Sequence, residues 1–190
     1  ALAGRKDTGV APPPARRMVM LIIIATVPLF VMVFLQDAVN QLFSNSIMVS
    51  CALLATGFIL FFSDRMARGH KTAKNATVAD ALIVGCGQAL AVIPGLSRSG
   101  TTISVGMMRG FDRAFAVRFS FLMSLPAVLG ANVLEIKDAL ASNFPIEELP
   151  MYLVGVAVSA VVGYFAIRLV KSLSDKGKFG KFAYYCWAVG

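Results

Sequence analysis

The sequence has few of the residues that soluble proteins use for metal sites, disulfides and charged surfaces. It contains one histidine and three cysteines, Cys51, Cys86 and Cys186, in 190 residues. These form no Cys-x-x-Cys pair or Cys/His cluster, so neither a zinc site nor a disulfide framework is predicted. We expect the cysteines to be small buried hydrophobic residues. Only 15% of the residues are charged and 57% are hydrophobic, which is far more apolar than a soluble domain of this length.

The apolar residues are grouped in blocks that are long enough to cross a bilayer. A transmembrane helix needs about 20 mostly apolar residues. Such blocks cover residues 18–36, 47–63, 119–134 and 151–167, and a last helix begins over residues 182–190. The sequence therefore predicts an all-α polytopic membrane protein with one membrane domain. There is no initial methionine and no signal-peptide pattern, so we expect the chain to be part of a longer protein.

The basic residues predict how the chain is threaded. The net charge of +8 would favour nucleic-acid binding on a soluble protein. Here the Lys and Arg residues lie in short loops between apolar blocks, where the positive-inside rule explains them. No nucleic-acid partner is expected. The basic segments are residues 1–17, 64–78, 109–118 and 168–181, whereas residues 135–150 are acidic.

Residues 79–109 are the segment that decides this topology. If they crossed the membrane once, the later loops would break the positive-inside rule twice. If they enter and return to the same side, every basic loop faces the cytoplasm. We therefore predict a re-entrant helix pair over residues 79–109, with its turn at residues 94–100. Broken helices of this kind commonly build substrate sites.

The predicted turn reads Pro-Gly-Leu-Ser-Arg-Ser-Gly-Thr-Thr over residues 94–102. The proline is expected to end the incoming helix, because it lacks an N–H and restricts the residue before it. Gly95 and Gly100 permit unusual dihedral angles and the close approach of a ligand. Ser99 is expected to be the N-cap of an outgoing helix over about residues 101–109.

These residue types suit the binding of a phosphate group. The first N–H groups of the outgoing helix are unpaired, and the helix dipole favours an anion there. Arg98 adds a permanent charge and a fork of donors, and Ser97, Ser99 and Thr102 add hydroxyl groups. The plainer interpretation is a surface arginine on an ordinary loop. An arginine at membrane depth costs about 2.5–3.5 kcal/mol on insertion scales, which favours the functional interpretation.

Residues 87–102 resemble the second signature of the undecaprenyl-pyrophosphate phosphatases, the family of bacitracin-resistance proteins. That signature is Pro-Gly-x-Ser-Arg-Ser-Gly-x-Thr, and residues 94–102 match all its fixed positions. The Phe-Ser-Phe-Leu run at residues 119–122 and Pro126 are similar to the family's next helix. The resemblance implies an inverted-repeat fold, of which this chain holds somewhat more than one half. It also implies hydrolysis of undecaprenyl pyrophosphate to undecaprenyl phosphate and inorganic phosphate, which recycles the lipid carrier for cell-wall synthesis.

The resemblance also implies roles for individual residues. Arg98 would bind the pyrophosphate, and Arg98, Ser97 and Ser99 would take part in catalysis. The implied substrate-binding residues are Arg98, Ser99, Gly100, Thr101, Thr102 and Gln88. The protein would be a multi-pass protein of the bacterial cytoplasmic membrane, with its active site facing outward, and a homodimer is compatible with this arrangement.

One departure from the family is large. Its first signature, a Glu-Gly-x-x-Glu pattern followed by Ser-Ser-x-Gly-His, does not occur in this sequence. The only histidine, His70, lies in a basic loop and is interpreted as a solvated residue. The family implies a divalent cation, Mg²⁺ or Ca²⁺, with no ligand in this chain, and we expect the cation ligands and the catalytic half of the site outside it. Asp80 and Asp112 are expected to cap helices or to pair with Arg113.

Three alternatives stay open at this point. The same fold could transport undecaprenyl phosphate across the membrane instead of hydrolysing its pyrophosphate. A phosphatase of the phosphatidic-acid-phosphatase type would need a Ser-Gly-His segment and an Arg-Pro segment, and neither occurs. A purely structural helix bundle would explain the glycines at helix contacts, but it would not explain Arg98 in a glycine-bracketed turn.

Overall fold

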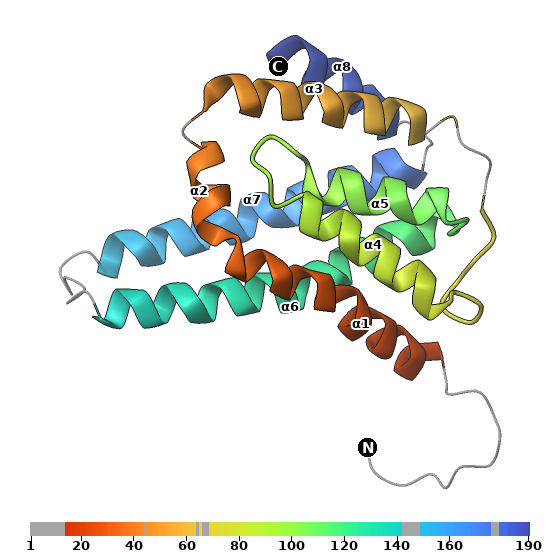
Figure 1. Cartoon of the computed structure of the whole chain (residues 1–190), viewed down its shortest axis with the longest axis horizontal. Helices are drawn as coiled ribbons and strands as arrows, with labels where there is room; N and C mark the ends of the chain where they lie inside the picture. The colour runs from red at the N-terminus through yellow and green to blue at the C-terminus, as the bar shows by residue number, and fades with distance from the viewer. Residues whose placement is uncertain (1–13, 44, 64, 66–68, 142–148, 176–178) are drawn as a thin grey trace, which may run out of the picture.

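The computed structural model of the chain is built from helices (Figure 1). It describes residues 14–43, 45–63, 65, 69–141, 149–175 and 179–190. The elements are α1 (Pro14–Phe34), α2 (Gln36–Phe43), α3 (Ser46–Ser63), α4 (Val78–Leu90), α5 (Arg98–Met108), α6 (Arg113–Ala141), α7 (Leu149–Asp175), the 3-10 turn η2 (Phe179–Lys181) and α8 (Phe182–Val189). Within these ranges there is no β-strand, and the single isolated bridge joins Lys71 to Phe111.

Four helices are long and apolar enough to cross a membrane. Their candidate spans are Ala15–Met32, Ser46–Ser63, Arg113–Lys137 and Pro150–Val170. Large apolar side chains on them, such as Phe30, Val133 and Phe165, are more than half exposed. A surface of this kind suits lipid and not water. The predicted all-α polytopic membrane protein is therefore confirmed.

Several helices extend further than the charge-free blocks. Helix α6 runs from Arg113 to Ala141, so Glu135 and Lys137 lie in this helix and not in a loop. Helix α7 carries Arg168 and ends at Asp175. The physical reason is that helices continue past the apolar core of the bilayer, where charged side chains can reach water. The acidic residues at 147 and 148 lie outside the described residues.

The cysteines correct one expectation. Cys186 is buried, but Cys51 on α3 and Cys86 on α4 are exposed. The prediction of three buried cysteines is therefore wrong for two of them. In a membrane protein an apolar side chain can face lipid as well as the protein core, because lipid tails are as apolar as the core.

Helices α4 and α5 form a hairpin whose outer ends lie at the same end of the molecule. In Figure 1, α4 runs inward from the right and α5 returns to that side, where α1 also begins. At about 1.5 Å per residue, the 13 residues of α4 and the 11 residues of α5 span about 20 Å and 16 Å. Neither arm could cross a hydrocarbon core of about 30 Å. This geometry supports the predicted re-entrant pair, with residues 91–97 at its tip.

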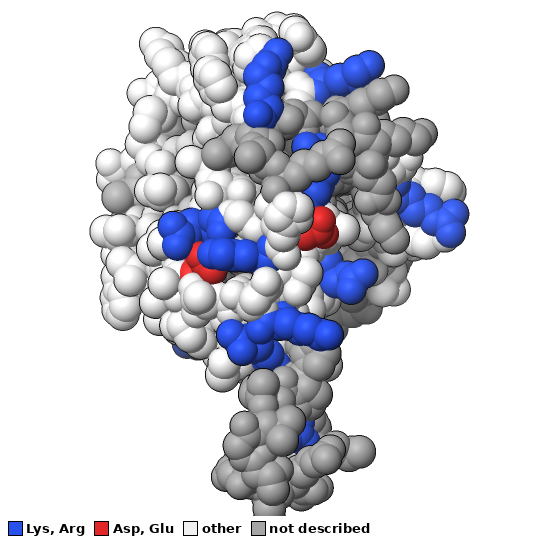
Figure 2. All heavy atoms as spheres, turned by 90° about the vertical axis from the view of Figure 1, so that its right-hand side faces the viewer, with Lys and Arg blue, Asp and Glu red and all other residues white. Residues whose placement is uncertain are grey.

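Lys and Arg side chains gather at the open end of this hairpin. Figure 2 shows this face, where blue side chains far outnumber red ones. The segments that meet there are the start of α1, the loop between α3 and α4, and the turn between α5 and α6. These segments carry basic residues such as Arg16, Lys74 and Arg109. Such an accumulation is typical of a cytoplasmic face.

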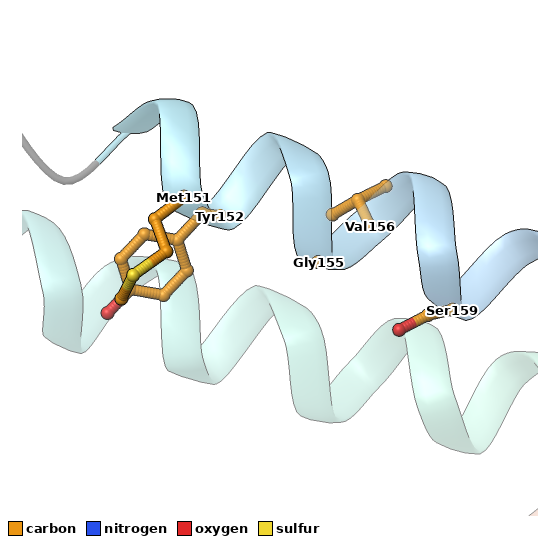
Figure 3. A pocket seen from close by; sticks show the side chains of 5 residues that line it. All are labelled: Met151, Tyr152, Gly155, Val156 and Ser159. Atoms are coloured by element: carbon orange, nitrogen blue, oxygen red, sulfur yellow. The ribbon is translucent and has the colours of Figure 1, made fainter.

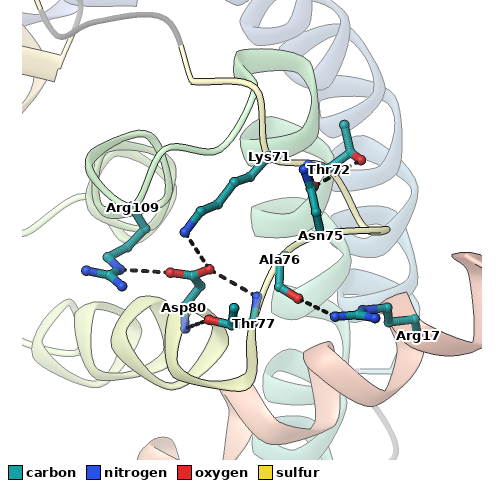
Figure 4. A network of polar contacts seen from close by, with 8 residues as sticks. All are labelled: Arg17, Lys71, Thr72, Asn75, Ala76, Thr77, Asp80 and Arg109. Carbon is teal, nitrogen blue, oxygen red and sulfur yellow. Dashed lines mark hydrogen bonds and ion pairs between the residues drawn. The ribbon is translucent and has the colours of Figure 1, made fainter. Parts of the chain in front are cut away.

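Asp80, in the first turn of α4, ties the two arms together at this end (Figure 4). Its side chain is fully buried. Oδ2 accepts hydrogen bonds from Lys71 Nζ at 2.8 Å and from the Thr77 N–H at 3.0 Å, and Oδ1 accepts one from Arg109 Nε at 2.9 Å. The Thr77 hydroxyl accepts a hydrogen bond from the Asp80 N–H, which completes a capping box. Because Arg109 follows α5, this ion pair joins the base of one arm to the base of the other.

Backbone contacts strengthen the same junction. The Lys71 N–H donates to the Gly110 carbonyl at 2.9 Å, and the Asp112 N–H donates to the Lys71 carbonyl at 2.8 Å. Asp112 Oδ2 accepts a hydrogen bond from the Phe115 N–H at 3.2 Å at the start of α6. The prediction that Asp80 and Asp112 cap helices is confirmed, and Asp80 forms ion pairs with Lys71 and Arg109.

The core that supports the hairpin lies between α1, α4, α5 and α6. Leu21, Val84, Ile103 and Phe119, one from each helix, are at most 1% exposed. At Gly85 an added Cβ would lie 2.2 Å from the Ala25 carbonyl oxygen, so α4 packs directly on the backbone of α1. The tip of the hairpin is therefore carried on a closely packed support.

Candidate phosphate site at the hairpin tip

The tip of the hairpin is held by α3. Gly95 has a φ of +91°, and an added Cβ would lie 2.3 Å from the Val49 carbonyl oxygen. The Thr56 hydroxyl, which is buried, lies 3.0 Å from both the Gly95 and the Ala52 carbonyl oxygens and accepts a hydrogen bond from the Ser97 N–H at 3.1 Å. The unusual dihedral angle expected at Gly95 is confirmed, since only glycine adopts this conformation readily. The close approach is made by the backbone of α3.

Helix α5 begins earlier than predicted. Ser97 is its N-cap, with extended backbone, and its hydroxyl accepts a hydrogen bond from the Gly100 N–H at 3.2 Å. The prediction of Ser99 as the N-cap is wrong, because the chain is already helical from Arg98. Gly100 is also helical, and an added Cβ would lie 3.1 Å from Leu60 Cδ2. Gly100 therefore serves close packing against α3 and not an unusual dihedral angle.

The early start places Arg98 and Ser99 in the first turn of α5. The amides of these two residues point out of the helix start, and in the described part of the chain neither has a hydrogen-bond partner. Unpaired amides and the positive end of the helix dipole favour an anion at this position. The guanidinium of Arg98 adds a full charge at the same place.

Arg98 and Ser99 form one wall of a cavity of about 340 Å³. The opposite wall comes from α6, which contributes Ser120, Phe121 and Ser124. This volume lies at the lower end of the range for small-molecule sites, about 300–1,000 Å³. The cavity thus combines one cation, three hydroxyl groups and one aromatic ring, a set that suits a phosphate group attached to an apolar chain.

Thr102 connects the two walls. Its hydroxyl lies 2.5 Å from the Ser120 hydroxyl and 2.9 Å from the Arg98 carbonyl oxygen, and it is fully buried. Ser120 is 4% exposed. Since a threonine hydroxyl has one proton and two lone pairs, it can bond both groups at once. Thr102 therefore fixes the first turn of α5 against α6.

Two of the predicted binding residues, Gln88 and Thr101, do not reach the cavity. Gln88 on α4 and Thr101 on α5 are buried and do not line the cavity. In the described residues, neither side-chain polar atom of Gln88 has a hydrogen-bond partner, and the Thr101 hydroxyl has none either. Buried polar atoms without partners are uncommon in native proteins. A direct role of Gln88 or Thr101 in substrate binding stays a prediction.

The described residues supply no metal cluster. No group of three or more His, Cys, Asp or Glu side chains lies together among them, and the cavity wall contains no carboxylate. Mg²⁺ and Ca²⁺ are bound mainly by carboxylate and carbonyl oxygens, so this donor set does not fit a divalent cation. His70 is exposed in the loop before α4, in agreement with its interpretation as a solvated residue.

A second hollow, of about 390 Å³, lies on α7 (Figure 3). It is lined by Met151, Tyr152, Gly155, Val156 and Ser159. This lining has no charged group, and the candidate span of α7 has none of its residues buried. Phosphate chemistry therefore favours the cavity at Arg98.

Sequence reasoning did not identify Thr56, Ser120 and Ser124 as parts of the site. Thr56 is one of four serine or threonine residues of α3, and Ser120 and Ser124 are the two of α6. That is a weak signal, because serine and threonine in membrane helices often bond their own backbone. Only the packing of α3 and α6 against the hairpin shows which of them reach the site.

Comparison with known proteins identifies the family of the chain. The family model described as "Bacitracin resistance protein BacA" matches residues 2–190. A protein of Halothermothrix orenii named undecaprenyl-diphosphatase is 40% identical over 92% of this chain and 68% of its own length. One of Methanobrevibacter smithii with the same name is 41% identical over 93% of this chain and 64% of its own length. The chain therefore spans about two thirds of the length of these relatives. A shorter relative, from Methanothermobacter thermautotrophicus and also named undecaprenyl-diphosphatase, is 42% identical over 90% of this chain and 95% of its own length.

Proposed function

Since this chain belongs to the bacitracin resistance protein BacA family, we propose that it hydrolyses undecaprenyl pyrophosphate to undecaprenyl phosphate and inorganic phosphate. The observation that carries the proposal is the cavity in which Arg98 and the start of α5 face a wall of hydroxyl groups. The names of the relatives favour hydrolysis over transport of the lipid.

The chemistry follows from the charges. Water attacks the terminal phosphorus atom, the bond to the bridging oxygen breaks, and the lipid phosphate leaves with that oxygen. Negative charge develops on the phosphoryl oxygens and on the leaving oxygen. Arg98, which lines the cavity, and the amides of Arg98 and Ser99 at the start of α5 would stabilise this charge. The cavity wall has no carboxylate or histidine, so we propose that the group that activates the water belongs to the longer protein.

The protein is a multi-pass membrane protein, and we propose that it lies in the bacterial cytoplasmic membrane with this cavity opening outward. The basic ends of the hairpin would then face the cytoplasm, and the tip would point away from it. A lipid substrate explains the membrane location, because its chain can stay in the bilayer. We propose further that Mg²⁺ or Ca²⁺ acts through ligands outside the described cavity. A homodimer is also proposed.

The test is phosphate release from undecaprenyl pyrophosphate by the full natural protein in detergent. Arg98→Ala is expected to lower the rate by about 10²–10³-fold, the usual loss when one donor to the transition state is removed. Arg98→Lys keeps the charge but not the two-pronged geometry, so an intermediate loss is expected. Arg118→Ala is the matched control, since Arg118 is an exposed arginine on α6 that does not line the cavity.

Two results would contradict the proposal. One is a complete and folded wild-type protein that releases no phosphate. The other is an Arg98→Ala variant as active as the Arg118→Ala control, which would place the phosphate elsewhere.

A further inference from the structure

The proposed function assigns no particular phosphoryl group to the wall of the cavity contributed by α6. Ser120 and Ser124 are four residues apart and therefore project from the same face of α6, with Phe121 beside them. Arg98 and Ser99 lie across the cavity. We propose that Ser120 and Ser124 bind the second phosphoryl group, the one attached to the lipid, and so make the site selective for a diphosphate over a monophosphate. This inference rests on the proposed function.

The size of the cavity supports a diphosphate. A buried water needs a cavity of only about 10–15 Å³, so the cavity of about 340 Å³ is far larger than a site for one small ion. It has room for the two phosphoryl groups of a diphosphate and the first atoms of an attached chain. One wall alone would leave half of such a ligand without polar contacts.

The hydroxyl of Ser124 is placed to change its partner. It donates to the Phe121 carbonyl in its own helix at 2.7 Å, and that carbonyl also accepts the ordinary helical hydrogen bond. Rotation about the Cβ–Oγ bond would turn the O–H of Ser124 away from the Phe121 carbonyl, so that it donates a hydrogen bond to a phosphoryl oxygen. A hydrogen bond to a charged group is roughly twice as strong as one between neutral groups, so an anion in the cavity favours the rotated state.

Ser120 is supported from behind by Thr102. The two hydroxyls are 2.5 Å apart and either atom could be the donor. While Thr102 donates to the Arg98 carbonyl, Ser120 has to donate to Thr102, because each hydroxyl has one proton. To bond a phosphoryl oxygen, Ser120 turns its proton into the cavity, and Thr102 turns its own proton from the Arg98 carbonyl to Ser120. Thr102 thus connects the two walls at the point where the two phosphoryl groups would meet.

The experiment measures equilibrium binding of two soluble probes to the full natural protein, methylenediphosphonate and inorganic phosphate. Methylenediphosphonate carries two phosphoryl groups and is not hydrolysed. Ser124→Ala is expected to weaken its binding about tenfold, the effect of losing one hydrogen bond to a charged group. Phosphate binding should change less than about twofold, because phosphate occupies the Arg98 wall. Ser124→Thr keeps the hydroxyl and should restore diphosphonate binding.

A matched control and the contrary outcomes complete the design. Thr26→Val removes a similar bond, from the Thr26 hydroxyl to the Ile22 carbonyl on α1, and should change neither probe. Equal weakening of both probes by Ser124→Ala, or no weakening, would overturn the assignment. Phosphate release from the lipid is measured in parallel. If the wild type releases phosphate but Ser124→Ala still prefers methylenediphosphonate over inorganic phosphate as the wild type does, only the role of α6 is refuted. If the wild type releases no phosphate, the proposed hydrolysis is refuted.

Discussion

Truncation of Asp80 should weaken the junction between the two arms of the hairpin at their base. The carboxylate is fully buried and accepts hydrogen bonds from Lys71, Arg109 and the Thr77 N–H. Asp80→Ala removes all three bonds and leaves two cations without their common partner. Because Lys71 belongs to the loop before α4 and Arg109 follows α5, no other described ion pair links these segments.

The magnitude follows from the exposure of the partners. Breaking a buried ion pair by removing one partner costs about 3–5 kcal/mol. The side chains of Lys71 and Arg109 are 35% and 40% exposed, so both can regain water, which reduces the cost. The Thr77 N–H loses its hydrogen bond to the Asp80 carboxylate, and the loss of this part of the helix cap costs about 1 kcal/mol. We expect a loss of about 2–3 kcal/mol in the free energy of unfolding, or about 4–12 °C in Tm for a chain of this size.

The pH dependence gives a second signature. Asp80 lies outside the four candidate spans. Burial raises its pKa, but the hydrogen bonds from Lys71, Thr77 and Arg109 outweigh burial, so the pKa lies below its usual value. A carboxyl group with a lowered pKa stabilises the fold above its unfolded pKa of about 3.9 and loses this effect as the pH falls. The difference in Tm between wild type and Asp80→Ala should therefore be constant from about pH 8 to 5 and narrow below about pH 4.

Thermal unfolding in detergent measures both effects. Asp112→Ala is the control, since Asp112 caps α6 through one hydrogen bond, to the Phe115 N–H, and should lose only about 1 kcal/mol. Arg109→Ala and the double variant Asp80→Ala/Arg109→Ala complete a double-mutant cycle, in which the two losses should not be additive. Additive losses, or an Asp80→Ala variant as stable as the Asp112→Ala control, would refute the view that Asp80 joins the arms.

Two further substitutions test the tip of the hairpin by the same unfolding measurement. Gly95→Ala should destabilise the protein by about 1–3 kcal/mol, because its φ is positive and the new Cβ meets the Val49 carbonyl. Gly130→Ala should not destabilise the protein, because an added Cβ there has no neighbour within 4 Å. Equal losses in the free energy of unfolding for the two variants would refute this account. Thr102→Val should cost about 1–3 kcal/mol by leaving the buried Ser120 hydroxyl unpaired, and adding Ser120→Ala should recover most of the loss, since replacing both partners is nearly neutral. A double variant less stable than Thr102→Val alone would contradict this.

The sequence was sufficient to predict the features that depend on local composition. Apolar blocks and loop charges predicted the polytopic helical fold. The positive-inside rule predicted a hairpin at residues 79–109, and the geometry of α4 and α5 supports it. Arg98 and Ser99, chosen from residue type and from resemblance, both line the cavity. These predictions rest on hydrophobicity, charge and short-range motifs, which a single sequence contains.

Features that depend on packing between distant segments could not be predicted. Thr56 reaches the Gly95 carbonyl 39 residues further along the chain, and Ser120 meets Thr102 only because α6 crosses α5. The choice between Ser97 and Ser99 as the N-cap was also not decided by sequence. Both are good capping residues, and the choice depends on the Ser97 N–H being held by Thr56.

The distribution of charge along the hairpin explains why the site lies at its tip. The base is joined by an ion pair, with cations that are partly solvated. The tip is joined by neutral hydrogen bonds of Thr56 and Thr102, which cost far less to bury than charges do. Between residues 81 and 108 the only charged side chain is Arg98, and among the described residues it has no ion partner. An arginine at membrane depth costs about 2.5–3.5 kcal/mol, and no ion pair among the described residues offsets this cost. A phosphate anion in the cavity would offset it, so the unpaired arginine is itself an argument for an anionic ligand.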